Sequence, residues 1–408
     1  MSFTALQLLE RCPLQWALTN GSYPQIWTDK GYPTKPSVAM LQGQVVHSAI
    51  AVVLRCLAHA GCQSSTDRCA AEALRKQGGL ALIVEDCVDS AIRQACGNPR
   101  LEFSLTALEN RVRGNAGSLR ERVQLLLSQV DLPRGIRTAN SRRGGTLHPR
   151  SRRPLTQGAH SDVVLLAPDL AWKGIADLIA IDGTRCAIAE FKTGKRQENH
   201  ELQILLYSLL WFHDRVLNPA GEPARKLTLL YADGAVNVTP PDPGELASLA
   251  TELLARSRRV LGSIQPQPPS SRLEPDSCRL CGVRQLCESY WDSLEQDGTV
   301  SPSDEVHGRR YVDAEVRILG NAGPTSWFAE ASNSQDLLRG ARLLLECTDR
   351  RMALEPKDVV RVLNGELRIH THQDAVASIL VIGVFTELFK VDSRSHTRSK
   401  MAPHRPAS

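Results

Sequence analysis

Two carboxylates and a lysine are spaced in this sequence so that they could share one metal-dependent site. Gly174-x2-Asp177 is followed, after twelve intervening residues, by Glu190-x-Lys192. Two carboxylates can hold Mg²⁺ or Mn²⁺ through hard oxygen ligands and leave positions open for water. The ion lowers the pKa of an attacking water, and a nearby lysine can stabilise the developing oxyanion. This set therefore suits hydrolysis of a phosphodiester.

The elements that must position these residues are two strands of a hairpin. Asp182-Gly183 is a favoured pair for a two-residue turn. A turn centred there makes Asp177 and Glu190 diagonal neighbours on one face, with Lys192 one pleat further along. The alternative is an ordinary hairpin with surface charges.

Three further polar residues lie in helical patterns on either side of the hairpin. His47 could complete a Mn²⁺ site as neutral imidazole, although a lone histidine is more often structural. Gln203 and Tyr207 lie one turn apart on a helix expected at about 198–214. Their alternative reading is a polar edge on a packed helix.

A second group of residues could bind a metal through sulfur. Cys278-x2-Cys281-x5-Cys287 brings three thiols together, and Cys12 is the natural fourth donor. Such a set suits zinc or an iron–sulfur cluster. Composition alone favours zinc. Seven other cysteines are expected to be small buried hydrophobes rather than disulfide partners: Cys56, Cys62, Cys69, Cys87, Cys96, Cys186 and Cys347.

The carboxylate, lysine and Gln-x3-Tyr motifs, in this order and with the string Glu-Phe-Lys-Thr-Gly, resemble the RecB-type nucleases of the PD-(D/E)XK superfamily. The resemblance covers the motif-bearing parts of residues 1–292. It implies a Mg²⁺- or Mn²⁺-dependent DNA nuclease whose metal is bound by His47, Asp177 and Glu190.

The same resemblance assigns the remaining site residues. It implies that Lys192 is catalytic and that Gln203 and Tyr207 support the site and contact DNA. Family members often carry another acid on the preceding strand, and Asp162 is the nearest candidate.

The cysteine spacing resembles the iron–sulfur branch of this family, which includes the AddB nuclease domain and the CRISPR-associated exonucleases. That likeness implies a [4Fe–4S] cluster on Cys12, Cys278, Cys281 and Cys287, with zinc as the other possibility. Binding would close the long loop 13–277, so the expected role is structural rather than redox-catalytic.

Length, composition and net charge exclude few classes of protein. The chain has 408 residues, 42% of them hydrophobic, and a net charge of +5, so no whole-chain basic field points to a polyanion. No apolar run is expected to reach the length of a membrane span, and no leader is recognised, so a cytoplasmic location is expected. No phosphate-binding Gly-x4-Gly-Lys-Ser/Thr loop occurs, so the chain brings no P-loop motor of its own.

The expected fold class is α/β, with a restriction-endonuclease-like mixed sheet flanked by helices over residues 1–292. A helical insertion is predicted at 37–130. A basic loop is predicted at 132–161, where seven arginines occur without an acid. That loop is either a solvated insertion or a contact to the DNA backbone.

The carboxy-terminal part should form a separate module. A polar linker is expected at 293–308, a small β domain at 309–392 and a disordered basic tail at 393–408. Residues 325–338 are its one helical candidate. An OB-like barrel here would offer a groove for single-stranded nucleic acid, and a protein-docking domain is the alternative.

Three functions remain open at this point. The first is a deoxyribonuclease, expected to be an exonuclease or directed to single strands or ends, in repair, recombination or defence. The second is a non-cleaving DNA-binding module that serves a helicase or another repair or defence protein. The third is a zinc-stabilised interaction protein without a nucleic-acid role.

Overall fold

The computed structural model describes residues 1–27, 31–133, 152–296, 304–306, 309–348, 352–372 and 375–391. Two compact units share the chain. The first contains Met1–Gln7, Pro36–Cys96 and Leu108–Leu261, and the second contains Leu8–Lys35, Gly97–Ala107 and Gly262–Ser408.

Parts of three predicted segments lie outside the described residues. They are 134–151 of the basic loop, 297–303 and 307–308 of the linker, and the tail from 392 onward. The predicted domain limits stay a prediction.

A helical layer forms one side of the first unit. It consists of α3 (Val38–Ala60), α4 (Arg68–Arg75), α5 (Gly79–Ala95), α6 (Leu105–Gly114, whose first turn belongs to the second unit) and α7 (Ala116–Leu127). The longest of these, α3, begins where Ser37 accepts the Met40 N–H and ends at Gly61, which has a φ of +72°. Its apolar stripe, from Leu41 to Leu57, is buried.

This helix corrects one expectation from the sequence. By length and composition alone, α3 is apolar enough to cross a membrane. Half of its most apolar window is buried inside the structure, as in a packed core helix, so the criterion is weak evidence for a span.

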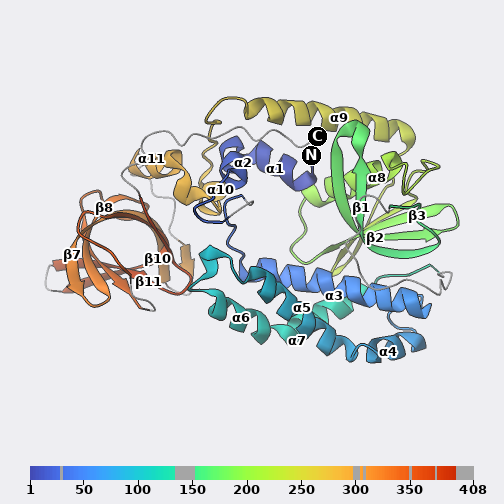
Figure 1. The fold of residues 1–408 in the computed structure, drawn as a ribbon, viewed down its shortest axis with the longest axis horizontal. Helices are drawn as coiled ribbons and strands as arrows, with labels where there is room; N and C mark the ends of the chain where they lie inside the picture. Colours follow the sequence, from blue (N-terminus) through green and yellow to red (C-terminus); the bar gives the residue numbers. More distant parts are fainter. Residues whose placement is uncertain are drawn as a thin grey trace. The chain divides into compact units, whose positions relative to one another are not determined.

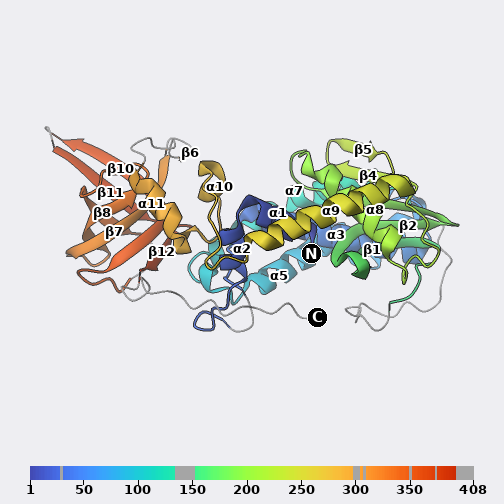
Figure 2. The same cartoon turned by 90° about the horizontal axis from the view of Figure 1, so that it is seen from above.

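A five-stranded sheet lies against these helices. Its strands are β1 (Gly158–Ala167), β2 (Trp172–Asp182), β3 (Arg185–Lys192), β4 (Lys226–Tyr231) and β5 (Gly234–Val238), in the order β1-β2-β3-β4-β5. Only the β3–β4 pair is parallel; the other pairs of this sheet are antiparallel. Helices α8 (Asn199–His213) and α9 (Pro243–Ser263) lie on the side opposite α3 (Figures 1 and 2). The predicted mixed α/β core is confirmed.

The hairpin between β2 and β3 differs from the predicted one by two residues. Asp182 pairs with Arg185, so the turn begins at Gly183 rather than being centred on Asp182-Gly183. Gly183 has a φ of +62°, and glycine is favoured at the first central position of a two-residue turn. A shift of two preserves the alternation of side chains. Extended by one residue, the register puts Asp177 opposite Glu190 rather than diagonal to it.

The second unit begins with α1 (Phe3–Arg11, whose first half belongs to the first unit) and α2 (Pro13–Asn20), and continues with α10 (Pro275–Arg279) and α11 (Glu288–Gln296). Its strands are β6 (Asp304–Val306), β7 (Arg309–Gly323), β8 (Ser326–Ser334), β9 (Arg342–Cys347), β10 (Val359–His372), β11 (Ala375–Ile382) and β12 (Glu387–Lys390).

Five of these strands close into a barrel, in the order β7-β8-β9-β11-β10 and back to β7. Among these five pairings only β9–β11 is parallel, and Figure 1 shows the ring they form. The predicted small β module is therefore present, and its likeness to an OB fold stays a prediction. The helical candidate at 325–338 is wrong, because it contains β8. Trp327, Ala329 and Ala331 point inward at the period of two that defines a strand.

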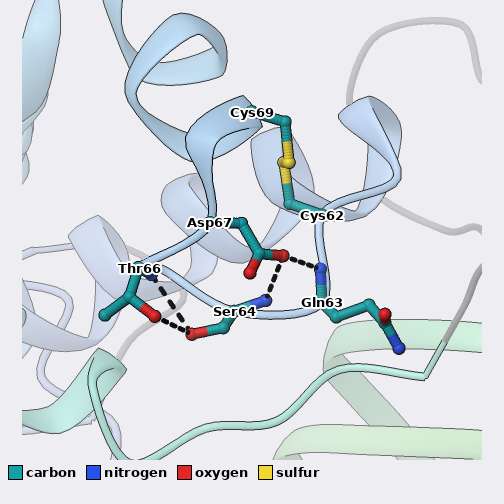
Figure 3. Close-up of a disulfide and its surroundings, with 6 residues drawn as sticks. All are labelled: Cys62, Gln63, Ser64, Thr66, Asp67 and Cys69. Atoms are coloured by element: carbon teal, nitrogen blue, oxygen red, sulfur yellow. Dashed lines mark hydrogen bonds between the residues drawn. A yellow bond between two sulfur atoms is a disulfide. The ribbon is translucent and has the colours of Figure 1, made fainter.

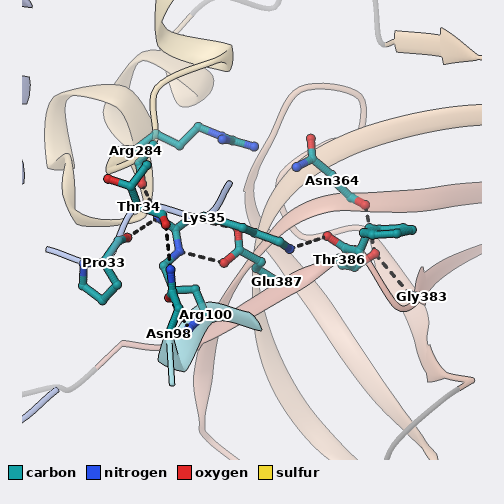
Figure 4. A network of polar contacts seen from close by, with 12 residues as sticks. Pro33, Thr34, Lys35, Asn98, Arg100, Arg284, Asn364, Gly383, Thr386 and Glu387 are labelled. Atoms are coloured by element: carbon teal, nitrogen blue, oxygen red, sulfur yellow. Dashed lines mark hydrogen bonds and ion pairs between the residues drawn. The ribbon is translucent and has the colours of Figure 1, made fainter. Parts of the chain in front are cut away.

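Arg100 ties three segments of the second unit together (Figure 4). Its guanidinium donates two hydrogen bonds to Glu387 at 2.8 and 2.9 Å, and one to the Pro33 carbonyl at 2.9 Å. Asn98 donates to the carbonyl of Thr34 at 2.8 Å. These bonds explain why the short segment Gly97–Ala107 belongs with the barrel.

The seven cysteines outside the predicted metal site differ in burial and in bonding. Cys62 and Cys69 form a disulfide in the first unit (Figure 3), which corrects the prediction that neither is a disulfide partner. Between them Asp67 accepts two backbone N–H groups, and this local turn brings the sulfurs together. The predicted burial is confirmed for Cys87, Cys186 and Cys347, whereas Cys96 is exposed and Cys56 half-buried. The cytoplasmic location stays a prediction.

Candidate active site

Asp177 is held from two sides at the point where β2 and β3 stop pairing. The ladder ends at Leu178 and Ala189. Beyond it, Oδ2 of Asp177 accepts the backbone N–H of Phe191 at 2.8 Å, and Oδ1 lies 3.2 Å from Nδ1 of His47. The Asp177 carboxylate therefore takes the place of a backbone carbonyl as the acceptor for the Phe191 N–H. Protein groups alone fix its orientation.

Glu190 is a nearly fully buried carboxyl, with 4% of its surface exposed. Its Oε1 accepts hydrogen bonds from Gln203 Nε2 at 2.9 Å and Lys192 Nζ at 3.2 Å. Its Oε2 is buried with no hydrogen-bond partner among the described residues. Burial raises the pKa of Glu190 well above its ordinary value, and the negative charge of Asp177 raises it further. An orphaned oxygen beside a second carboxylate is what a divalent cation would satisfy.

Gln203 connects this carboxyl to the lysine and to Tyr207. Its Oε1 accepts from Lys192 Nζ at 2.6 Å, and its Nε2 donates to the Tyr207 hydroxyl at 2.7 Å. The Tyr207 ring lies directly over Gly174, where an added Cβ would be 2.8 Å from it and 2.9 Å from Leu210. The glycine of Gly-x2-Asp is therefore required for the close approach of α8 to β2.

His47 reaches the site from α3. Burial disfavours its protonated form, but the hydrogen bond and charge of Asp177, with the charge of Glu190, outweigh burial and raise the pKa of His47. The imidazole is therefore oriented by a carboxylate, as metal-bound histidines usually are.

Asp162 lies beside this group. The β1–β2 ladder pairs the residues on either side of both Asp162 and Asp177, so the two acids face each other across the strands. Asp162 has a φ of +53° and is exposed, and its Oδ2 lies 3.4 Å from Nη1 of Arg55. Sequence reasoning missed Arg55; its place two turns after His47 on α3 was the available signal.

Four cysteines line one cavity of about 30 Å³ in the second unit: Cys12, Cys278, Cys281 and Cys287. Burial, and to a smaller extent the charges of neighbouring cysteines, raise the pKa of Cys278 and Cys281, and that of Cys287 to about 11. Three arginines also line the cavity, namely Arg11, Arg272 and Arg284. Four sulfurs with cations around them suit a tetrathiolate centre, which carries net negative charge.

As they stand, no three His, Cys, Asp or Glu side chains in the described parts of the chain form a group that could hold a metal ion. The sequence-predicted residues thus lie in two separate sets. His47, Asp177, Glu190, Lys192, Gln203 and Tyr207 lie together in the first unit, and the four cysteines in the second.

Comparison with known proteins identifies the class. The family model of the PD-(D/E)XK nuclease superfamily matches residues 1–288. The chain belongs to this superfamily. The restriction-endonuclease-like fold class is confirmed with it.

The comparisons with curated proteins and with solved structures support no further functional statement. No curated protein matches the chain. A solved structure described as "Crystal structure of SSO0001" is 20% identical to the chain, with a TM-score of 0.20. That match covers 32% of this chain and 61% of the other, so the chain spans less than two thirds of that structure.

Proposed function

We propose that the protein is a RecB-type deoxyribonuclease that uses Mg²⁺ or Mn²⁺ and cleaves DNA at ends or in single strands. The observation that carries this proposal is the buried Glu190 beside Asp177, with one carboxylate oxygen unsatisfied and Lys192 held at the other. Repair, recombination or defence would use such an activity. DNA, a helicase partner and a cytoplasmic location belong to the same proposal.

His47, Asp177 and Glu190 would hold the ion, and Asp162 would assist them. The ion would neutralise charge on the phosphate and lower the pKa of the attacking water. Because Gln203 Oε1 holds the lysine ammonium at 2.6 Å, Lys192 enters the reaction already oriented.

Each remaining side chain has a positioning role. Lys192 donates to a phosphate oxygen as negative charge develops there. His47 fixes one oxygen of Asp177, and the Phe191 N–H fixes the other. Tyr207 holds Gln203 through its hydroxyl, so the network continues from the reacting centre into the packed face of α8.

We also propose that Cys12, Cys278, Cys281 and Cys287 hold a [4Fe–4S] cluster with a structural role. Support comes from four sulfurs that line one cavity together with arginines. Purification under anoxic conditions should give a brown protein that absorbs near ~400 nm. A colourless protein that contains one zinc per chain would contradict the cluster.

The test of the nuclease proposal is cleavage by the wild-type protein. We expect hydrolysis of DNA with Mg²⁺ or Mn²⁺, none with EDTA, and faster cleavage of single-stranded than of blunt duplex substrates. DNA binding without hydrolysis under every metal condition would contradict the proposal and support a non-cleaving module. Faster cleavage of RNA than of DNA would contradict the substrate class.

A further inference from the structure

The loop that follows Lys192 carries an exposed arginine, Arg196, above an aromatic ring. Its guanidinium carbon lies 5.2 Å from the ring centroid of Tyr231. Arg196 Nη2 is 3.4 Å from Oδ1 of Asp233, and the Arg196 side chain remains 54% exposed. A guanidinium has five N–H donors. This ion pair engages one nitrogen, at a long distance, and leaves the fork accessible to another anion.

Tyr231 is a fixed platform next to the lysine. It pairs with Lys192 in the β3–β4 register, where neighbouring strands are about 4.8 Å apart. Its ring is buried, its hydroxyl is 2.9 Å from Nδ1 of His200, and its carbonyl accepts from Gln129 at 2.8 Å. Because the ring is buried and its hydroxyl is engaged, it offers a fixed aromatic face to the guanidinium above it.

We propose that Arg196, stacked on Tyr231, forms a phosphate-binding subsite that holds a backbone phosphate next to the scissile one. This inference rests on the proposed nuclease function and names a contact of the same site. An arginine fork matches two oxygens of a phosphodiester, and stacking preserves that geometry. Asp177 and Glu190 repel a polyanion, so a cation beside Lys192 has a clear electrostatic role.

Asp233 allows a phosphate-binding role of Arg196 to be distinguished from a purely structural role of the Arg196–Asp233 ion pair. In a phosphate subsite its carboxylate competes with the nucleic acid for Arg196, so its removal should strengthen binding. In a structural tie, removing either partner should weaken the protein in the same way. The two roles therefore predict opposite signs for Asp233→Asn.

The chain offers a matched control at the other end of β3. Arg185 Nη2 is 3.2 Å from Asp182 Oδ2, and both side chains are exposed. Like Arg196–Asp233, this is an exposed arginine–aspartate pair with a similar N–O distance. Arg185, however, lies seven residues before Lys192, about 23 Å along the strand. Changes here should leave binding unaltered.

The experiment measures binding of a labelled single-stranded DNA to the full-length protein in EDTA, over a series of KCl concentrations. We expect Arg196→Ala to weaken binding about tenfold and to reduce the slope of log K against log salt by about 0.7. Arg196→Lys should restore most of the slope, and Asp233→Asn should tighten binding a few-fold. Arg185→Ala and Asp182→Asn should match the wild type.

Three results would overturn the inference while leaving the nuclease intact. The first is an Arg196→Ala slope equal to that of Arg185→Ala. The second is weaker binding and a lower melting temperature for both Arg196→Ala and Asp233→Asn. The third is an Arg196→Lys protein whose DNA affinity and salt slope are no higher than those of Arg196→Ala. A wild-type protein that neither binds nor cleaves DNA would instead overturn the proposed function itself.

Discussion

The carboxylate site and the cysteine site prepare for their metals in opposite ways. Asp177 and Glu190 stand on neighbouring strands and are held by hydrogen bonds from His47, Phe191 and Gln203. Among the described residues, this network leaves one carboxylate oxygen, Oε2 of Glu190, without a hydrogen-bond partner. Protein groups therefore position this site in the absence of a metal ion. Removal of the ion should abolish catalysis without unfolding the protein.

The cysteine site depends on much shorter elements. Three thiols lie on or beside a five-residue helix and a 3-10 turn, and the fourth comes from the junction of α1 and α2. Burial raises the pKa of three of them, so without metal they are neutral thiols. Metal binding must release these protons and join distant segments, so its binding free energy becomes folding free energy.

The largest effect is expected from breaking the sulfur set. Cys281→Ala should abolish the chromophore and lower the free energy of unfolding of the second unit by several kcal/mol. Cys347→Ala, a buried cysteine of the barrel, is the control and should cost about 1 kcal/mol. Absorption spectra and denaturant titration measure both. Equal stability of the two variants would remove the structural role of the cysteine site.

A large effect on rate, without one on stability, is expected at Lys192. Lys192→Ala should lower the cleavage rate about 100- to 1000-fold, because it removes a preorganised donor. Its unfolding midpoint should stay close to that of Lys173→Ala, an exposed lysine on β2. Single-turnover cleavage and thermal melting provide the comparison. A mainly destabilised Lys192→Ala protein would make the lysine structural.

A moderate effect on stability should come from the glycine under Tyr207. Gly174→Ala places a Cβ 2.8 Å from the tyrosine ring and should destabilise the first unit by about 2 kcal/mol. Gly194→Ala is the matched control, because its added Cβ meets nothing within 4 Å. Calorimetric melting compares them, and indistinguishable melting temperatures would contradict the packing argument.

The smallest effect is expected at Gln203. Gln203→Ala should slow cleavage about tenfold, because Lys192 keeps its charge and loses only one orienting acceptor. Gln197→Ala, in the preceding exposed loop, should be silent. Rates measured with saturating Mn²⁺ separate this effect from metal affinity. A Gln203→Ala rate as low as that of Lys192→Ala would make the glutamine part of the reacting centre.

Local patterns predicted the site better than they predicted its exact geometry. The period of two along a strand grouped Asp177, Glu190 and Lys192, and a register error of two residues left that grouping intact. The register itself depended on whether Gly183 stands first or second in the turn, a choice that one dipeptide leaves open.

Other features are non-local or ambiguous in sequence. The contact between Arg55 and Asp162 depends on how α3 packs against β1. Aspartate adopts a left-handed conformation more often than most residues, but residue type alone does not show which aspartate does so. Residues 325–338 satisfy both helix and strand patterns, and closure of the barrel selects the strand. The Cys62–Cys69 disulfide depends on a turn that Asp67 makes between two helices.

The most direct test of the central claim is DNA cleavage by Asp177→Ala, compared with the wild type in Mn²⁺. The variant should keep the absorption spectrum and melting behaviour of the second unit, because its cysteines are untouched. We predict cleavage at background level, at least about 1000-fold below the wild type. A folded Asp177→Ala protein that cleaves within tenfold of the wild-type rate would show that the carboxylate site is not the active site.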